Sequence, residues 1–121
     1  MKKTKPIEIL VVEDEPEILS LLQELFERRG YKVTACNSGN SALKLAQKKQ
    51  FSVILTDLIM PGIDGFKLIE SLKELIPISR LIVMSGAGIQ VLQDLTKLGV
   101  ENYIVKPIDF DNLIKTINML I

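Results

Sequence analysis

The chain has 121 residues, of which 47% are hydrophobic, enough for one compact domain with a single core. Fifteen Lys and Arg residues balance fifteen Asp and Glu residues, so no overall charge attracts the protein to nucleic acid or to an acidic membrane. The chain has no histidine, so the commonest general base is excluded. The lone Cys36 cannot form an internal disulfide and is expected to be a small, partly buried hydrophobe.

The beginning of the chain does not look like a secretory signal. Residues 1–5 are basic, but Glu8 interrupts the short apolar run that follows them. No later segment is long and apolar enough to cross a bilayer. We therefore expect a cytoplasmic protein without membrane insertion.

Short apolar runs alternate along the chain with segments whose apolar residues have helical spacing. This alternation is typical of a parallel sheet covered by helices on both faces. No linker rich in Pro or Gly divides the chain, so we expect a single domain over residues 1–121, an α/β fold with a doubly wound, five-stranded (βα)5 sheet. The predicted strands cover residues 7–12, 32–35, 53–56, 81–84 and 103–105.

A helix is expected after each strand. The first has Ile18 and Phe26 on its apolar face and should end at Gly30, because glycine favours the backbone conformation that ends helices. The second has a choice of N-caps, and the third should end before Pro77. The N-cap of the second helix is expected at Ser38, Asn40 or Ser41. The third and fourth helices should cover about residues 66–75 and 91–98. The last helix should have its N-cap at Asp109 or Asp111 and an apolar face made of Phe110, Leu113, Ile114, Ile117 and Ile121.

Polar side chains lie at or just beyond the ends of four predicted strands. Glu13 and Asp14 follow the first strand and Asp57 ends the third, while Ser85 and Lys106 follow the fourth and the fifth. Ligands in open α/β sheets bind beyond the carboxyl ends of the strands. We therefore expect these five side chains to share one small site.

The chemistry of this set points to a divalent cation and an anion. Three neighbouring carboxylates raise one another's pKa unless a cation neutralises them, and ligands that are all hard oxygens favour Mg²⁺. Lys106 offers a positive charge suited to a phosphoryl oxygen, and Ser85 offers a hydroxyl donor. Each residue alone is better explained by a turn, a helix start or a surface charge. Their shared location at strand ends favours a functional site.

These motifs resemble those of the receiver domains of two-component response regulators, over essentially the whole chain. Residues 11–15 look like the family's acidic pair, residues 55–65 like its phosphoacceptor segment, residues 82–86 like its hydroxyl-bearing strand end, and residues 103–107 like its aromatic, Lys and Pro sequence. The resemblance implies a flavodoxin-like fold with strand order 2-1-3-4-5.

The resemblance also implies a mechanism. Asp57 would accept a phosphoryl group from a sensor histidine kinase or a histidine phosphotransfer protein, in a reaction that requires Mg²⁺. Asp14, Asp57 and the backbone carbonyl of Ile59 would bind the metal directly, and Glu13 would bind it mainly through water. The protein would thus be a signalling switch with its own phosphotransfer and autodephosphorylation, and not an enzyme that turns over.

In this mechanism Lys106 pairs with the phosphoryl group, and its peptide bond with Pro107 is expected to be cis. Ser85 hydrogen-bonds the same group and opens space for Tyr103, which relays the change to the face of the fourth helix, the fifth strand and the last helix. Ser85 stands where the family more often has threonine, so the packing of the switch should be looser. Gly86, Ala87 and Gly88 suggest a mobile loop next to it.

Output is expected through contact with an unknown downstream protein and without direct binding to nucleic acid, since no output domain follows in this chain. The chain is either a stand-alone regulator or a receiver cut from a longer one, and either a monomer or a dimer that forms on phosphorylation. The alternative function is a pseudo-receiver that only binds proteins, against which the complete set of acids, Ser85 and Lys106 argues. An aspartyl phosphatase would need a general acid where this chain has Ile59, and that apolar side chain should also slow phosphoryl loss.

Overall fold

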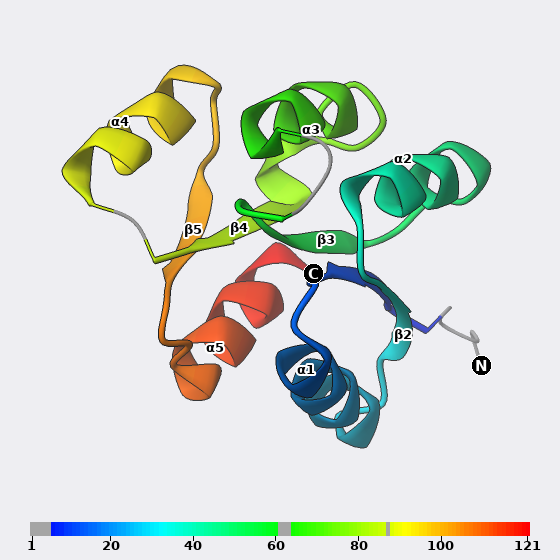
Figure 1. Ribbon diagram of the computed structural model, residues 1–121. Helices are drawn as coiled ribbons and strands as arrows, with labels where there is room; N and C mark the ends of the chain where they lie inside the picture. The colour runs from blue at the N-terminus through cyan, green and yellow to red at the C-terminus, as the bar shows by residue number, and fades with distance from the viewer. Residues whose placement is uncertain (1–5, 61–63, 87) are drawn as a thin grey trace.

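The computed structural model describes residues 6–60, 64–86 and 88–121, and its centre is a parallel sheet of five strands (Figure 1). The strands lie in the order β2-β1-β3-β4-β5, and each neighbouring pair is parallel. The expected fold and strand order are therefore confirmed. The strands are β1 (Glu8–Val12), β2 (Lys32–Cys36), β3 (Val53–Asp57), β4 (Leu81–Ser85) and β5 (Asn102–Val105).

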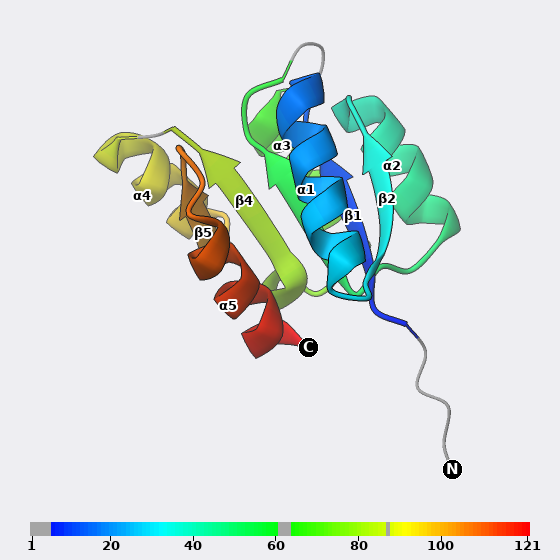
Figure 2. The same ribbon diagram turned by 90° about the horizontal axis from the view of Figure 1, so that it is seen from below.

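Helices cover both faces of this sheet. In Figures 1 and 2, α1 and α5 lie on one face, and α2, α3 and α4 lie on the other. This layering lets both faces of the central strands exclude water, as their continuously apolar sequences predict. The helices are α1 (Pro16–Arg28), α2 (Gly39–Lys48), α3 (Gly65–Leu72), α4 (Ile89–Lys97) and α5 (Phe110–Leu120).

The helix ends follow the local signals in the sequence. Ser38 caps α2 by accepting a hydrogen bond from the Ser41 backbone N–H (3.2 Å), and Asp109 caps α5 in the same way. Gly30 has a positive φ of 85° just after α1, as expected for a residue that ends a helix.

The third helix is shorter than predicted. It ends at Leu72, and the following turn brings Ile76 into the core, while Leu75 is left 41% exposed. The N–H groups of both residues donate to the carbonyl of Leu72, so the chain tightens into a turn at this point. The prediction of a regular helix to residue 75 was wrong, because the Leu75 N–H bonds three residues back in a tighter turn and Pro77 disfavours helical backbone at Ile76.

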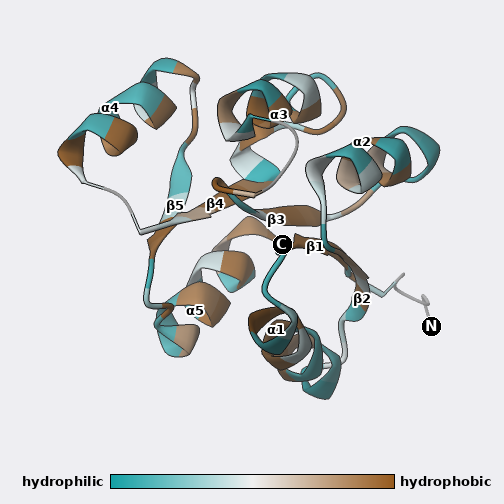
Figure 3. Cartoon of the chain, viewed as in Figure 1, coloured by the Kyte–Doolittle hydropathy of each residue, from teal (hydrophilic) through white to brown (hydrophobic). Residues whose placement is uncertain are grey.

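The core consists of two hydrophobic clusters separated by the sheet. Alternate strand residues point to opposite faces: Leu10 and Val12 join the cluster beneath α2, α3 and α4, whereas Ile9 and Val11 join the cluster beneath α1 and α5. In Figure 3 the central strands β1, β3 and β4 are largely coloured as hydrophobic, whereas β2 and β5 at the edges of the sheet include hydrophilic stretches. All residues of β3 and β4 are buried, so the centre of the sheet is the rigid base on which the site stands.

None of the helices in the described part of the chain is both long and apolar enough to cross a membrane.

Candidate functional site

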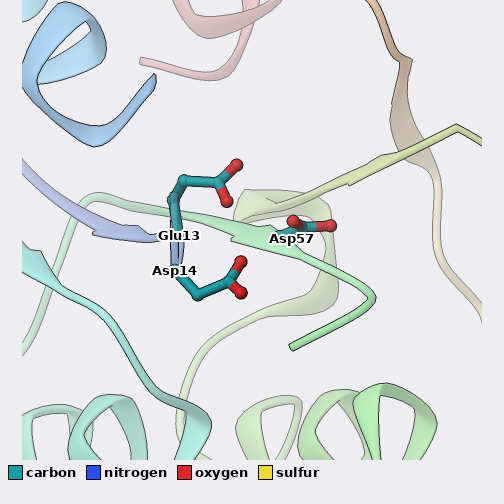
Figure 4. Close-up of side chains that lie close together, drawn as sticks. All are labelled: Glu13, Asp14 and Asp57. Atoms are coloured by element: carbon teal, nitrogen blue, oxygen red, sulfur yellow. The ribbon is translucent and has the colours of Figure 1, made fainter. Parts of the chain in front are cut away.

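Three carboxylates gather at the carboxyl edge of the sheet (Figure 4). Glu13 and Asp14 directly follow β1, and Asp57 is the last residue of the neighbouring strand β3. One carboxylate oxygen from each lies within 4.8 Å of the other two. Glu13 and Asp57 are buried and Asp14 is half-buried, so the cluster opens toward solvent on the Asp14 side. The structure thus brings together the acids that the sequence placed at strand ends.

Backbone groups hold Glu13 in its buried position. Its N–H donates to the carbonyl of Cys36 at the end of β2 (3.1 Å), which extends the pairing of β1 and β2 by one residue. Its carboxylate oxygen Oε2 accepts a hydrogen bond from the backbone N–H of Glu15 (3.1 Å), immediately before α1 begins at Pro16. The turn from β1 into α1 therefore folds around this carboxylate.

Lys106, the residue directly after β5, joins the acidic cluster. Its Nζ lies 2.8 Å from Oδ2 of Asp57 and 3.1 Å from Oε1 of Glu13, and it donates a hydrogen bond to each. Its backbone N–H donates to the carbonyl of Ser85 (2.8 Å), which fixes the start of the side chain beside β4. The peptide bond between Lys106 and Pro107 is cis, as expected.

Burial and charge oppose each other in this site. Burial raises the pKa of Glu13 above its usual range, although hydrogen bonds from the Glu15 backbone and from Lys106 act in the other direction. Burial acts to lower the pKa of Lys106, but the hydrogen bonds and charges of Asp57 and Glu13 outweigh it and raise this pKa overall. One ammonium faces three acids, so the site favours additional positive charge.

The residues present fit a hard divalent cation such as Mg²⁺. All three acidic groups offer oxygen ligands, and their spacing allows one ion to contact them together. Ile59 lies beside them, because its backbone N–H donates to Oδ1 of Asp57 (3.2 Å). The Ile59 side chain is 75% exposed.

The expected switch residues lie on the two adjacent strands β4 and β5. Ser85 ends β4 and is buried, opposite Val105 in the register. Tyr103 lies opposite Val83 and packs, half-buried, against the cluster beneath α2, α3 and α4. The loop over residues 86–88 that was expected to be mobile contains Ala87, and the segment that resembles the phosphoacceptor motif contains residues 61–63. Ala87 and residues 61–63 lie outside the described residues.

A shallow apolar hollow next to Lys106 was missed by the sequence reasoning. It has a volume of about 460 Å³, and its lining includes Ile18 of α1, Pro107 and Phe110. Phe110 was expected on the buried face of the last helix but is 37% exposed, because it is the first residue of α5 and precedes the buried stripe that starts at Leu113. An aromatic residue directly after the Asp109 cap was the signal that could have indicated it.

Comparison with known proteins agrees with this geometry. The family model of the response regulator receiver domain matches residues 9–118. The transcriptional regulatory protein ZraR of Escherichia coli is 34% identical over 112 residues, which are 92% of this chain but only 25% of ZraR. Sporulation initiation phosphotransferase F of Bacillus subtilis is 31% identical over 87% of this chain and 86% of its own length.

Solved structures agree as well. The response regulator TrrA of Thermotoga maritima, determined in complex with Mg²⁺ and BeF, has a TM-score of 0.84 and 29% identity over 95% of this chain and 99% of that one. The chemotaxis protein CheY4 of Vibrio cholerae has a TM-score of 0.88 over 97% of this chain and 100% of that one; at 24% identity it supports the fold alone. The chain belongs to the response regulator receiver domain family of two-component systems.

Proposed function

We propose that this protein is a phosphorylation-controlled switch in which Asp57 accepts a phosphoryl group. The observation that carries the proposal is the buried Asp57 carboxylate, held 2.8 Å from the Lys106 ammonium within a cluster of three acids. A buried acid paired with a single lysine would need no further acids for stability. Two more carboxylates at the same edge create a site that favours a cation, as a phosphoryl-transfer site does.

The reaction we propose uses a phosphohistidine donor. A carboxylate oxygen of Asp57 attacks phosphorus; the new P–O bond forms as the P–N bond breaks, and the histidine nitrogen keeps the electron pair. Lys106 already contacts Asp57 Oδ2, so its ammonium stands where negative charge arrives on the phosphoryl oxygens. The Ile59 N–H orients the other carboxylate oxygen.

Mg²⁺ is the cofactor that the site would use. Asp14, Asp57 and the backbone carbonyl of Ile59 would bind it directly, and Glu13 would act through water because its carboxylate is engaged by Lys106 and Glu15. When bound, the ion would neutralise charge on the acids and the phosphoryl group. The oxygen-only donor set supports this choice, as does the Mg²⁺ and BeF complex of TrrA.

Ser85 and Tyr103 are the residues through which the modified state would be read. Ser85 ends the strand next to Asp57, and Tyr103 lies on the following strand. Movement of the Ser85 hydroxyl toward a phosphoryl oxygen would open space for Tyr103, whose ring packs partly on the core. The change would appear at the face of α4, β5 and α5, where Leu92 and Val105 are exposed.

The phosphodonor would dock in the hollow beside Lys106. A donor that brings a phosphohistidine to Asp57 must cover the surface around Lys106, and this surface is apolar where Ile18, Pro107 and Phe110 meet. An apolar surface next to a charged site suits a helix of a histidine kinase or of a histidine phosphotransfer protein. Small donors such as acetyl phosphate would not use the hollow.

Phosphorylation with acetyl phosphate and Mg²⁺, followed by intact-protein mass spectrometry, tests the function. We expect the wild-type protein to gain one phosphoryl group and the isosteric Asp57→Asn variant to gain none; Asp94→Asn, on α4, is the matched control and should behave like wild type. The proposal fails if wild type gains no phosphoryl group, or if Asp57→Asn is modified equally well. In that case the chain would be a pseudo-receiver that only binds other proteins.

The docking proposal has its own test. Phe110→Ala should slow phosphoryl transfer from a phosphorylated histidine phosphotransfer protein and leave labelling by acetyl phosphate unchanged. Met119→Ala, an exposed apolar residue at the far end of α5, is the control. Equal transfer rates for both variants would contradict docking in the hollow.

A further inference from the structure

Gly65, the first residue of α3, packs so tightly on Leu58 that no side chain fits there. A Cβ at this position would overlap the carbonyl oxygen of Leu58, and it would lie 2.8 Å from the carbonyl carbon and 2.9 Å from Cδ1. Gly30 and Gly88 are different, because a Cβ there would meet nothing within 4 Å. Gly65 does not have a positive φ, so it is required for space and not for backbone conformation.

The carbonyl that Gly65 contacts belongs to the peptide group between Leu58 and Ile59. A peptide group is planar, so the Leu58 carbonyl and the Ile59 N–H move together as one rigid unit. The Ile59 N–H is the group that donates to Oδ1 of Asp57 (3.2 Å). A single peptide plane therefore links the start of α3 to the carboxylate of Asp57.

The rest of Leu58 is fixed, so this plane can move only by rotation. The Leu58 N–H donates to the carbonyl of Met84 in β4 (3.0 Å), and the Leu58 side chain is buried. Pressure on the Leu58 carbonyl from α3 would thus turn the plane and move the Ile59 N–H away from Asp57. The Asp64 side chain, which caps α3 through the Phe66 N–H (2.8 Å), keeps the helix start in place against Leu58.

We propose that Gly65 is a positioning residue for the phosphoacceptor: the close contact of its bare α-carbon with the Leu58 carbonyl sets the peptide plane that orients the Asp57 carboxylate. The inference rests on the proposed role of Asp57. It assigns to α3, which supplies none of the clustered acids, a direct part in the geometry of the site. It also means that displacement of α3 changes the orientation of the Asp57 carboxylate, and that reorientation of this carboxylate displaces α3.

The test compares Gly65→Ala with Gly88→Ala, which adds the same methyl group in open space at the start of α4. For each variant, circular dichroism identifies the temperatures at which the protein is fully folded. The dissociation constant of Mg²⁺ and the rate of labelling by acetyl phosphate are then measured at those temperatures. We expect Gly65→Ala to weaken Mg²⁺ binding and slow labelling on the order of tenfold, and Gly88→Ala to match wild type. A folded Gly65→Ala protein with wild-type Mg²⁺ affinity and labelling rate would overturn the inference and leave the proposed function intact.

A second measurement, on the wild-type protein, decides the question if Gly65→Ala does not fold. During an NMR titration with Mg²⁺, the amide signals of Ile59 and Gly65 should shift together with the same midpoint, whereas that of Gly30 should not move. A shift at Ile59 without one at Gly65 would overturn the inference alone. Wild type that neither responds to Mg²⁺ nor accepts a phosphoryl group would overturn the proposed function along with it.

Discussion

Replacement of Asp14 by asparagine should stabilise the metal-free protein. One oxygen of Asp14 lies within 4.8 Å of an oxygen of Glu13 and of Asp57, while the ammonium of Lys106 is hydrogen-bonded to those two acids. At this distance each like-charge pair costs about 0.9 kcal/mol in water and about 3.5 kcal/mol at an effective dielectric constant of ~20. Because Asp14 is half-exposed, the lower value applies, and two pairs cost about 2 kcal/mol. Taking the same separation for the Lys106 ammonium, its attraction to Asp14 offsets one of these two pairs, so the expected gain is ~1 kcal/mol.

Urea unfolding followed by far-UV circular dichroism measures this gain, since the chain has no tryptophan for fluorescence. The comparison is made in EDTA and again with Mg²⁺, with Glu101→Gln, an exposed acid at the opposite edge of the sheet, as the control for loss of one negative charge. We expect Asp14→Asn to be more stable than wild type in EDTA and to gain less from Mg²⁺. An Asp14→Asn protein no more stable than wild type in EDTA would refute the view that uncompensated repulsion is built into the site.

Four further outcomes are expected. Phe26→Ala should lower the free energy of unfolding, measured in urea, by about 3–5 kcal/mol, because Phe26 lies on the inner face of α1 and is fully buried. Burial raises the pKa of Cys36 to about 11, so in the folded protein at neutral pH it should react with a disulfide reagent about 100-fold more slowly than a free thiol. The hydrogen bond from Lys49 lowers the pKa of Glu8, so the ionised Glu8 stabilises the folded protein, by at most about 1 kcal/mol. This contribution should be complete above the ordinary glutamate pKa and should disappear as the pH falls through the lowered pKa. The difference in unfolding free energy between wild type and Glu8→Gln, measured across acidic pH, tests this. Ile59→Asn should speed loss of the phosphoryl group, because the apolar Ile59 side chain would no longer exclude water from the phosphorylated Asp57. The rate is measured by mass spectrometry after the donor is removed, and an unchanged or slower rate would contradict this.

The sequence was sufficient to predict the acidic cluster because it follows from topology. Parallel strands all end at the same edge, so Glu13, Asp14 and Asp57 had to come together once the strands were placed. Each predicted strand differs from the observed one by one residue at one end and agrees with it at the other.

Other features depended on three-dimensional packing that no local pattern contains. Lys106 and Glu13 are 93 positions apart, and only the structure shows that one ammonium is shared between Glu13 and Asp57. Similarly, the sequence marked Gly65 only as the last residue of the segment that resembles the phosphoacceptor motif, whereas its importance comes from contact with a backbone carbonyl seven positions earlier. Periodicity placed Phe110 on the buried face, but a residue in the first turn of a helix can lie beyond the end of the core.

The division of the core by the sheet has a consequence for how such a domain can diversify. The proposed donor hollow lies on the side of α1 and α5, and Tyr103 packs on the cluster of the other side. A substitution that reshapes one cluster leaves the packing of the other largely undisturbed, since the fully buried strands β3 and β4 stand between them. Substitutions around Tyr103 can therefore alter the proposed output without disturbing the donor hollow, whereas substitutions in α5, which contributes to both the hollow and the output face, change both.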